Sequence, residues 1–318
     1  MGDFVYEGIV AVTIDVVDSP TDANPNRVTF SADASGRRDD STATFIYRIK
    51  DVKDKNNGLL EATKLTVKEV QSIVNAKSEN AAERSTDEKD EDTNRKILFS
   101  VHGYNGNPRG YLLQVKYYEQ RFKKFQIVPV IWPSAGFALG YFSDKALSRA
   151  AGKAFQSLIP ISESFSKSIL CHSMGNRVLK YFAKGPLACS FDNIFMVAPD
   201  LNNDLFNKNN VERGNNYALL IKDLLTKEKG GKIHVLYNKN DSDLLLSTVV
   251  NFGCRLGRQG VPLDDDDGCN LFRKKDNVHP AVKDFVVNVD WTNNTPSHPH
   301  NYQFDWSVVH YYESQYLQ

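Results

Sequence analysis

Residues 167–176 read KSILCHSMGN, and this stretch decides the fold. An apolar run ends at a tight turn centred on Ser173, and helix-forming residues follow it. The pattern is typical of a nucleophile elbow, in which a serine lies at a sharp strand-to-helix turn with its hydroxyl exposed. The N–H of the next residue, Met174, then points toward a developing oxyanion. On its own, the stretch also fits a serine that caps a helix after a buried strand.

The residues on either side of Ser173 test this prediction. Small side chains are wanted two positions before and after the serine, because the strand and the helix pass close together there. Gly175 meets this requirement on one side. Cys171 stands on the other side, where the usual pattern has glycine. Cysteine is small, so the departure weakens the match without breaking it.

A second stretch, residues 97–108 (ILFSVHGYNGNP), favours the catalytic interpretation. An apolar strand runs into a Gly/Asn loop, and Pro108 suits the first turn of a helix. Hydrolases with a nucleophile elbow take a second oxyanion donor from such a loop, just beyond a His-Gly pair. The backbone N–H of Tyr104 is therefore the predicted donor. In isolation the stretch fits an ordinary strand-to-helix loop. It precedes the elbow along the chain, however, which is the order found in such hydrolases.

The acid that orients a catalytic histidine is expected after strand 232–237. Asp241 in the loop that follows is the first choice. Asp243 falls in the first turn of the next predicted helix, where the helix dipole explains an acidic residue. Asp200, just after strand 193–198, is the alternative acid, since some lipases take theirs from that position.

The general base is expected beyond the last strand, at 285–291. The loop there carries His298 and His300, and a final helix carries His310. A base must reach the serine hydroxyl from a partly exposed loop, which favours the first two. His298 stands between prolines and fits a turn, so His300 is the predicted base. The chain order Ser, Asp, His is the order of α/β-hydrolases.

The whole chain predicts a single α/β domain over residues 1–318. Strands at 5–16 and 42–50 are expected to form an antiparallel N-terminal edge within residues 1–60, and the charged segment 78–95 is expected to be a mobile surface loop. A lid or insertion is expected over 242–283. From residue 97 onward strands and helices alternate, which predicts a mostly parallel, doubly wound sheet with its ligand at the carboxyl ends of the strands. The predicted elements are 97–101, 108–123, 126–131, 141–157, 167–171, 174–184, 192–197, 215–228, 232–237, 243–250, 284–291 and 304–316.

From about residue 95 to its end, the chain resembles a poorly characterised branch of the α/β-hydrolases, a domain of unknown function similar to esterases and lipases. Seven stretches in the same order carry the resemblance: 102–105 (HGYN), 131–134 (IWPS), 172–176 (HSMGN), 198–200 (APD), 240–241 (ND), 255–257 (RLG) and 300–302 (HNY). The resemblance implies Ser173 as nucleophile, Asp241 as orienting acid and His300 as base. It does not identify a substrate.

These motifs predict a serine hydrolase that cleaves carboxylesters or thioesters through an acyl-enzyme. Gly103, His172 and Trp132 are expected to line the substrate pocket. Tyr104, Trp132, Phe137 and residues 244–250 are candidates for an apolar acyl site. Peptidase action uses the same nucleophile and stays open. An alternative of another class is a catalytically silent fold that serves as a binding module.

Bulk properties fit one soluble enzyme domain. The chain has 318 residues, 41% of them hydrophobic and 25% charged, which is enough to bury a substantial core. The net charge is zero, so nothing favours nucleic acid or an anionic membrane surface as partner. There is no apolar run long enough to span a membrane. The N-terminus lacks signal-peptide features, so we expect a cytoplasmic location, unless a targeting segment has been removed.

The sequence predicts no metal and no cofactor. Residues 264–268 (DDDDG) lack the spaced ligands and closing glutamate of a calcium loop, and they fit a solvated acidic loop. There is no zinc spacing and no phosphate-binding glycine loop. A bridge between Cys254 and Cys269 would close a loop of about fifteen residues and stabilise the fold by about 3 kcal/mol. A cytosolic setting favours free thiols instead.

Overall fold

We describe the protein from a computed structural model. The structure describes residues 7–12, 27–31, 45–51, 59–66, 68–70, 72, 96–104, 108–122, 124–132, 134, 140–156, 166–185, 190–212, 214–226, 230–251, 253–263, 278–294 and 298–315. The charged segment at 78–95 lies outside these residues. No helix within them is both long enough and apolar enough to cross a bilayer.

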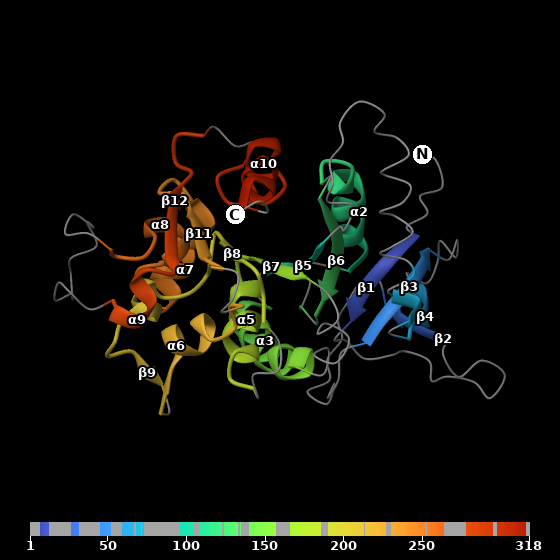
Figure 1. The fold of residues 1–318 in the computed structure, drawn as a ribbon, viewed down its shortest axis with the longest axis horizontal. Helices are drawn as coiled ribbons and strands as arrows, with labels where there is room; N and C mark the ends of the chain where they lie inside the picture. Colours follow the sequence, from blue (N-terminus) through green and yellow to red (C-terminus); the bar gives the residue numbers. More distant parts are fainter. Residues whose placement is uncertain are drawn as a thin grey trace.

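A twisted sheet runs through the described part of the chain (Figure 1). Six neighbouring strands in it are parallel, in the order β12-β11-β8-β7-β5-β6. Their apolar runs are buried because helices cover both faces of the sheet. The predicted mostly parallel, doubly wound α/β fold is therefore confirmed. The six strands are β5 (Lys96–Val101), β6 (Phe125–Ile131), β7 (Lys167–His172), β8 (Ile194–Val197), β11 (Ile233–Tyr237) and β12 (Val286–Asp290).

The N-terminal edge of the sheet differs in detail from the prediction. Strand β1 (Glu7–Val12) joins β6 in parallel, and the antiparallel pairing begins only with β3 (Phe45–Asp51). Two further strands, β4 (Leu59–Lys64) and β2 (Arg27–Ser31), complete the edge in antiparallel register. No strand was expected between the two predicted strands at 5–16 and 42–50. That expectation was wrong for β2, whose alternating residues lie within an Asp/Asn/Pro-rich segment.

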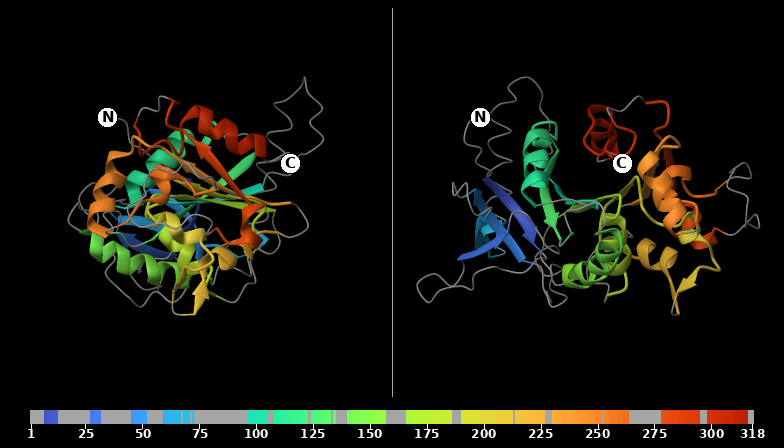
Figure 2. Two further views of the ribbon diagram at one scale, coloured as in Figure 1. Left: turned by 90° about the vertical axis from the view of Figure 1, so that its left-hand side faces the viewer. Right: turned by 180° about the vertical axis from the view of Figure 1, so that it is seen from behind.

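The helices lie in two layers, one on each face of the parallel strands (Figures 1 and 2). Helices α2 (Pro108–Glu119) and α10 (Trp306–Ser314) share one apolar cluster and cover one face. Helices α3 (Tyr141–Phe155), α5 (Gly175–Phe182) and α6 (Tyr217–Lys222) share the cluster on the other face. Each amphipathic helix buries its apolar stripe against the sheet, which fixes the strand ends between the layers.

The chain between β11 and β12 was expected to be a lid or insertion. It begins with helix α7 (Ser242–Asn251) and continues with the short helices α8 (Leu256–Gln259) and α9 (Pro280–Lys283). Between β8 and α6 lie a short 3-10 helix, η3 (Asn203–Phe206), and the two-residue strands β9 (Val211–Glu212) and β10 (Asn215–Asn216). The acidic run 264–268 lies outside the described residues.

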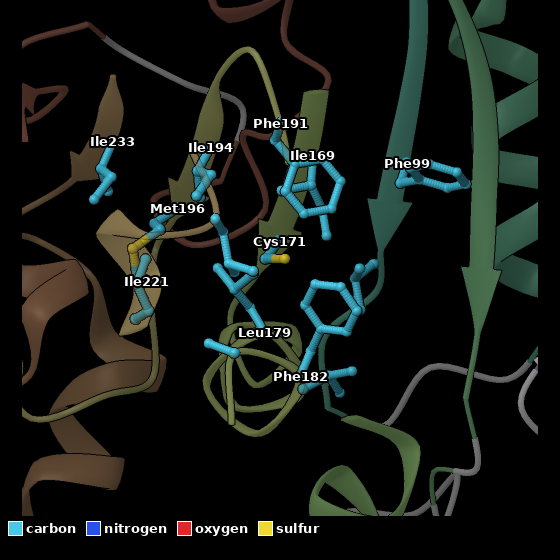
Figure 3. Close-up of a cluster of buried hydrophobic side chains, with 14 of the residues drawn as sticks. Phe99, Ile169, Cys171, Leu179, Phe182, Phe191, Ile194, Met196, Ile221 and Ile233 are labelled. Atoms are coloured by element: carbon cyan, nitrogen blue, oxygen red, sulfur yellow. The ribbon is translucent and has the colours of Figure 1, made fainter. Parts of the chain in front are cut away.

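The core on the α5 side positions the strand that ends at Ser173. Figure 3 shows Cys171 on β7, with Leu179 and Phe182 of α5 close to it. Helices α3 and α5 approach so closely that a Cβ on Gly152 would lie 2.6 Å from the carbonyl oxygen of Val178. Dense packing of this kind tolerates little displacement, so α5 and the turn before it are held in place.

Candidate active site

Ser173 occupies a strained turn between β7 and α5. Its φ is +50°, in the left-handed region that non-glycine residues rarely adopt. Backbone hydrogen bonds on both sides hold the turn. The N–H of Ser173 donates to the carbonyl oxygen of Val197 at 2.9 Å, and the N–H of Asp200 donates to the carbonyl oxygen of Ser173 at 3.2 Å. The surrounding structure thus enforces the sharp turn predicted from the sequence.

The two small residues around Ser173 have different surroundings. A Cβ on Gly175 would lie 2.6 Å from the carbonyl oxygen of His102, so glycine is required there. Cys171 is fully buried, and its thiol packs into the core. The amide of Asn176 donates to the carbonyl oxygens of Cys171 and Ser173, at 2.8 and 3.0 Å. The cysteine is therefore accommodated without opening the turn.

The structure brings Ser173, His300 and Asp241 together. Nε2 of His300 lies 3.0 Å from Oγ of Ser173, and Nδ1 of the same ring lies 2.7 Å from Oδ2 of Asp241. Asp241 is fully buried, and its Oδ1 accepts the N–H of Leu244 at 2.9 Å. All three distances are those of hydrogen bonds. The carboxylate fixes the imidazole with its free nitrogen toward the serine hydroxyl.

The two other candidate histidines lie elsewhere. Nδ1 of His298 accepts the N–H of His300 at 3.2 Å, so His298 holds the turn that presents His300. His310 is exposed on α10. Neither ring is in hydrogen-bond contact with Ser173 among the described residues. Asp243 is exposed in the first turn of α7.

Electrostatics favour a charged form of His300. Burial by itself would lower the pKa of His300, but the hydrogen bond and the negative charge of Asp241 outweigh burial, so the pKa is raised above the ordinary 6.5. The buried carboxylate therefore stabilises the imidazolium that proton abstraction from Ser173 would create.

Two further buried histidines support the site in their neutral form. Burial lowers the pKa of His172 to about 3 and that of His102 to about 4. Nε2–H of His172 donates to the carbonyl oxygen of His300 at 3.0 Å, because a carbonyl oxygen only accepts. Nδ1–H of His102 donates to the carbonyl oxygen of Gly103 at 2.8 Å. These bonds tie the loops on either side of Ser173 to the ends of the strands.

The two predicted oxyanion donors lie beside Ser173. Gly103 is so close that a Cβ there would be 2.9 Å from Cβ of Ser173 and 3.0 Å from Nδ1 of His172, which places the backbone leading to Tyr104 against the serine. Met174 immediately precedes α5. Within the described part of the chain, its N–H has no assigned hydrogen-bond partner.

A cavity of about 750 Å³ opens in front of Ser173 and His300. Gly103 and His172 line it, as predicted, and so does Tyr104. Trp132 does not, and that prediction was wrong. Its ring is fully buried and stacks on His102 with 5.1 Å between centroids, and its indole N–H donates to the carbonyl oxygen of His102 at 2.9 Å. Phe137 lies outside the described residues.

Asp200, the alternative acid, belongs to a separate buried network. Its carboxylate forms ion pairs of 3.4 Å with Arg177 and Arg255, and it accepts hydrogen bonds from Tyr141 and Ser247 at 2.8 and 2.6 Å. The charge of Asp200 is thus neutralised by two guanidinium groups. The sequence analysis missed these partners because they come from α3, α5, α7 and the residue before α8, and no local pattern links these segments.

The described residues contain no cluster of His, Cys, Asp and Glu that could hold a metal ion. Cys254 is disulfide-bonded, so the expectation of free thiols is wrong there. Cys269, the partner considered for it, lies outside the described residues. Cys171 is a free, buried thiol, and burial raises its pKa well above the usual value.

A parallel sheet with a strained serine turn at the end of a central strand defines the class of α/β-hydrolase folds. Within that class, residues 77–267 match the family described as alpha/beta hydrolase of unknown function, DUF900. The match covers more than half of the chain, and the chain belongs to this family. None of the curated proteins compared with the chain matches it.

Proposed function

We propose that the protein is a serine hydrolase that cleaves small carboxylesters or thioesters through an acyl-enzyme. The observation that carries this proposal is the continuous chain of hydrogen bonds from Asp241 through His300 to Ser173, at 2.7 and 3.0 Å. It ends at a cavity of about 750 Å³, within the size range of small-molecule sites. Membership of the α/β-hydrolase family agrees with this chemistry.

In the first half-reaction, Nε2 of His300 takes the proton of Ser173 while Oγ attacks the carbonyl carbon of the substrate. The negative charge that develops on the carbonyl oxygen is held by the N–H groups of Tyr104 and Met174. His300 then gives its proton to the leaving alcohol or thiol, and the carbonyl group is re-formed as an ester of Ser173.

The second half-reaction repeats these steps with water. His300 takes a proton from the attacking water, the same two N–H groups hold the oxyanion, and Oγ of Ser173 leaves with the proton that His300 returns. Asp241 keeps Nδ1 of the ring protonated and stabilises the imidazolium in both halves. Ester bonds are favoured over amide bonds as substrates because an alcohol or thiol leaves the tetrahedral intermediate more readily than an amine does.

Labelling with an alkyl fluorophosphonate, followed by peptide mapping, tests the proposal. We expect the label on Ser173, together with hydrolysis of p-nitrophenyl butyrate. Ser173→Ala should abolish both with little change in melting temperature. Ser247→Ala is the matched control, because Ser247 also lines the cavity and should not take the label. A wild-type protein that is neither labelled nor active would favour the alternative, a silent fold that binds ligands.

A further inference from the structure

The cavity in front of Ser173 has two unlike walls. Helix α2 and the loop that carries His300 form one wall, and the start of α3 and helix α7 form the other. Contacts hold each pair of elements together. Nη1 of Arg121, just after α2, donates to the carbonyl oxygen of Phe304 at 2.8 Å, and the hydroxyl of Tyr141 lies 3.1 Å from Oγ of Ser247. Helices α2 and α3 lie on opposite faces of the sheet (Figure 1).

The wall made by α3 and α7 presents apolar side chains beside the polar groups of Tyr141, Asp243 and Ser247. Leu246 and Val250 lie four positions apart on α7 and line the cavity together with Phe142. Leu246 and Phe142 are 69% and 67% exposed, so this wall offers apolar surface that the folded chain leaves uncovered. An apolar ligand group that covered it would gain binding energy in proportion to the area removed from water.

The opposite wall presents a buried amide. Gln303 lines the cavity, is 3% exposed, and has an Oε1 without a hydrogen-bond partner among the described residues. Buried polar groups are normally paired, because the loss of water is costly unless another partner replaces it. A ligand group that hydrogen-bonds to the Gln303 amide would satisfy it.

The reaction chemistry assigns one part of the substrate to each wall. His300 must give its proton to the leaving oxygen, so the alcohol part of an ester has to lie on the side of His300. Gln303 belongs to the same loop, three residues further on. The acyl part must then extend to the other side of Ser173, toward Leu246 and Phe142.

We propose that the site selects carboxylic esters that combine an apolar acyl chain with an alcohol bearing a further hydroxyl group, such as a monoester of a polyol. The acyl chain lies along Phe142, Leu246 and Val250, and Gln303 hydrogen-bonds the free hydroxyl of the alcohol. This inference rests on the proposed function and adds the specificity of both halves of the substrate.

The acyl side is tested with p-nitrophenyl esters of increasing chain length, which keep the leaving group constant. For the wild type, kcat/KM should rise by about fourfold with each added methylene until the chain exceeds the wall. Leu246→Ser should flatten this rise and leave the acetate ester almost unaffected. Leu245→Ser is the matched control, since Leu245 is 49% exposed on the same helix and is not among the described residues that line the cavity. An equal loss in both variants would overturn the assignment to the cavity and indicate that the helix docks on ester aggregates.

The alcohol side is tested with 2-hydroxyethyl butyrate and propyl butyrate, which differ by a hydroxyl in place of a methyl group. The kcat/KM for the hydroxyethyl ester, divided by that for the propyl ester, should fall by about tenfold in Gln303→Met. The same ratio should stay unchanged in Gln120→Met, a control at an exposed glutamine. If Gln303→Met fails to fold, the wild-type ratio decides: a preference for the propyl ester overturns the role of Gln303.

These results separate the inference from the proposed function. A protein that is labelled at Ser173 and hydrolyses all of these esters equally well would keep the serine mechanism and refute the two-wall specificity. A protein that takes no label at Ser173 would remove the basis of both.

Discussion

The N–H of Asp200 donates to the carbonyl oxygen of Ser173, and the side chain of Asp200 joins two buried guanidinium groups. The backbone of one residue therefore supports the strained serine turn while its carboxylate organises the wall of the cavity. Arg177, one of its partners, lies four residues after Ser173 on α5. Asp200 is thus a structural neighbour of Ser173 and makes no contact with His300 among the described hydrogen bonds.

Asp200→Asn should reduce the stability of the fold. Loss of the negative charge leaves Arg177 and Arg255 buried without a counter-charge. Removing one partner of a buried ion pair costs about 3–5 kcal/mol. Urea unfolding would show this as a lower midpoint. Asp243→Asn is the control, because that carboxylate is exposed, and it should change the midpoint little. A stable Asp200→Asn protein that has lost all turnover would instead point to Asp200 as the catalytic acid.

Asp241→Asn should leave the fold in place and lower turnover by about 10³–10⁴-fold, on the model of serine triads in general. The amide can still accept the N–H of Leu244 through its oxygen. Its NH₂ group would face Nδ1 of His300 and turn the ring into the wrong tautomer. Steady-state kinetics and thermal unfolding measure the two effects separately. Near-normal turnover in this variant would contradict the role of Asp241.

The pH dependence of kcat/KM should report the titration of His300. The base must be neutral, and the pKa of His300 is raised, so activity should fall as the pH drops through a midpoint above 6.5. His172 and His102, with pKa values of about 3 and 4, stay neutral in this range and add no second step. Asp241→Asn should move the midpoint down, and His310→Ala should not move it. A wild-type midpoint below pH 6 would speak against the pairing.

The same pKa shift predicts an opposite trend in stability. A histidine whose pKa is raised on folding stabilises the folded state fully below its unfolded pKa, near 6.5, and loses this contribution as the pH rises through the folded pKa. The contribution of the His300–Asp241 pair should therefore be largest where activity is lowest. Unfolding midpoints of the wild type and Asp241→Asn, compared between pH 6 and 9, should converge as the pH rises. A constant difference would contradict the linkage.

Gly175→Ala and Cys171→Ala should separate the two small positions of the elbow. The added methyl group at Gly175 has backbone atoms within 3 Å, so we expect a loss of about 2 kcal/mol and impaired labelling of Ser173. Cys171→Ala removes only a buried sulfur atom, at about 1 kcal/mol, and should keep full labelling. Loss of labelling in the cysteine variant would show that its thiol shapes the site.

Long apolar runs made the centre of the fold predictable from the sequence. Strands β5, β6, β7 and β11 lie within a residue of their predicted positions, because continuous burial on both faces requires such runs. Strand β2 was missed because the residues before and after it are typical of turns. Its place in the sheet depends on pairing with β4, which no local sequence pattern reveals.

The residues of the candidate site that follow a strand were predictable from the sequence. Ser173, Asp241 and His300 each follow a strand of the parallel sheet, and the topology brings these strand ends to one edge. Side-chain direction was not predictable. Trp132 also follows a strand, yet its ring turns inward onto His102. The apolar run at 244–250 was predicted as part of an acyl site, and Leu246 and Val250 of this run line the cavity. Gln303 carries no local signal, since its place in the cavity depends on which elements meet there.

The bond from His172 to the backbone of His300 has a consequence for the order in which the proposed site is assembled. It joins residues 128 positions apart, and the contact between Ser173 and His300 joins residues 127 apart. The residues of the serine turn between β7 and α5 are synthesised before residue 300, so the contact between Ser173 and His300 can form only after the loop beyond β12 has been made. Under the proposed mechanism, the nascent protein cannot form an acyl-enzyme until the chain has been made beyond β12.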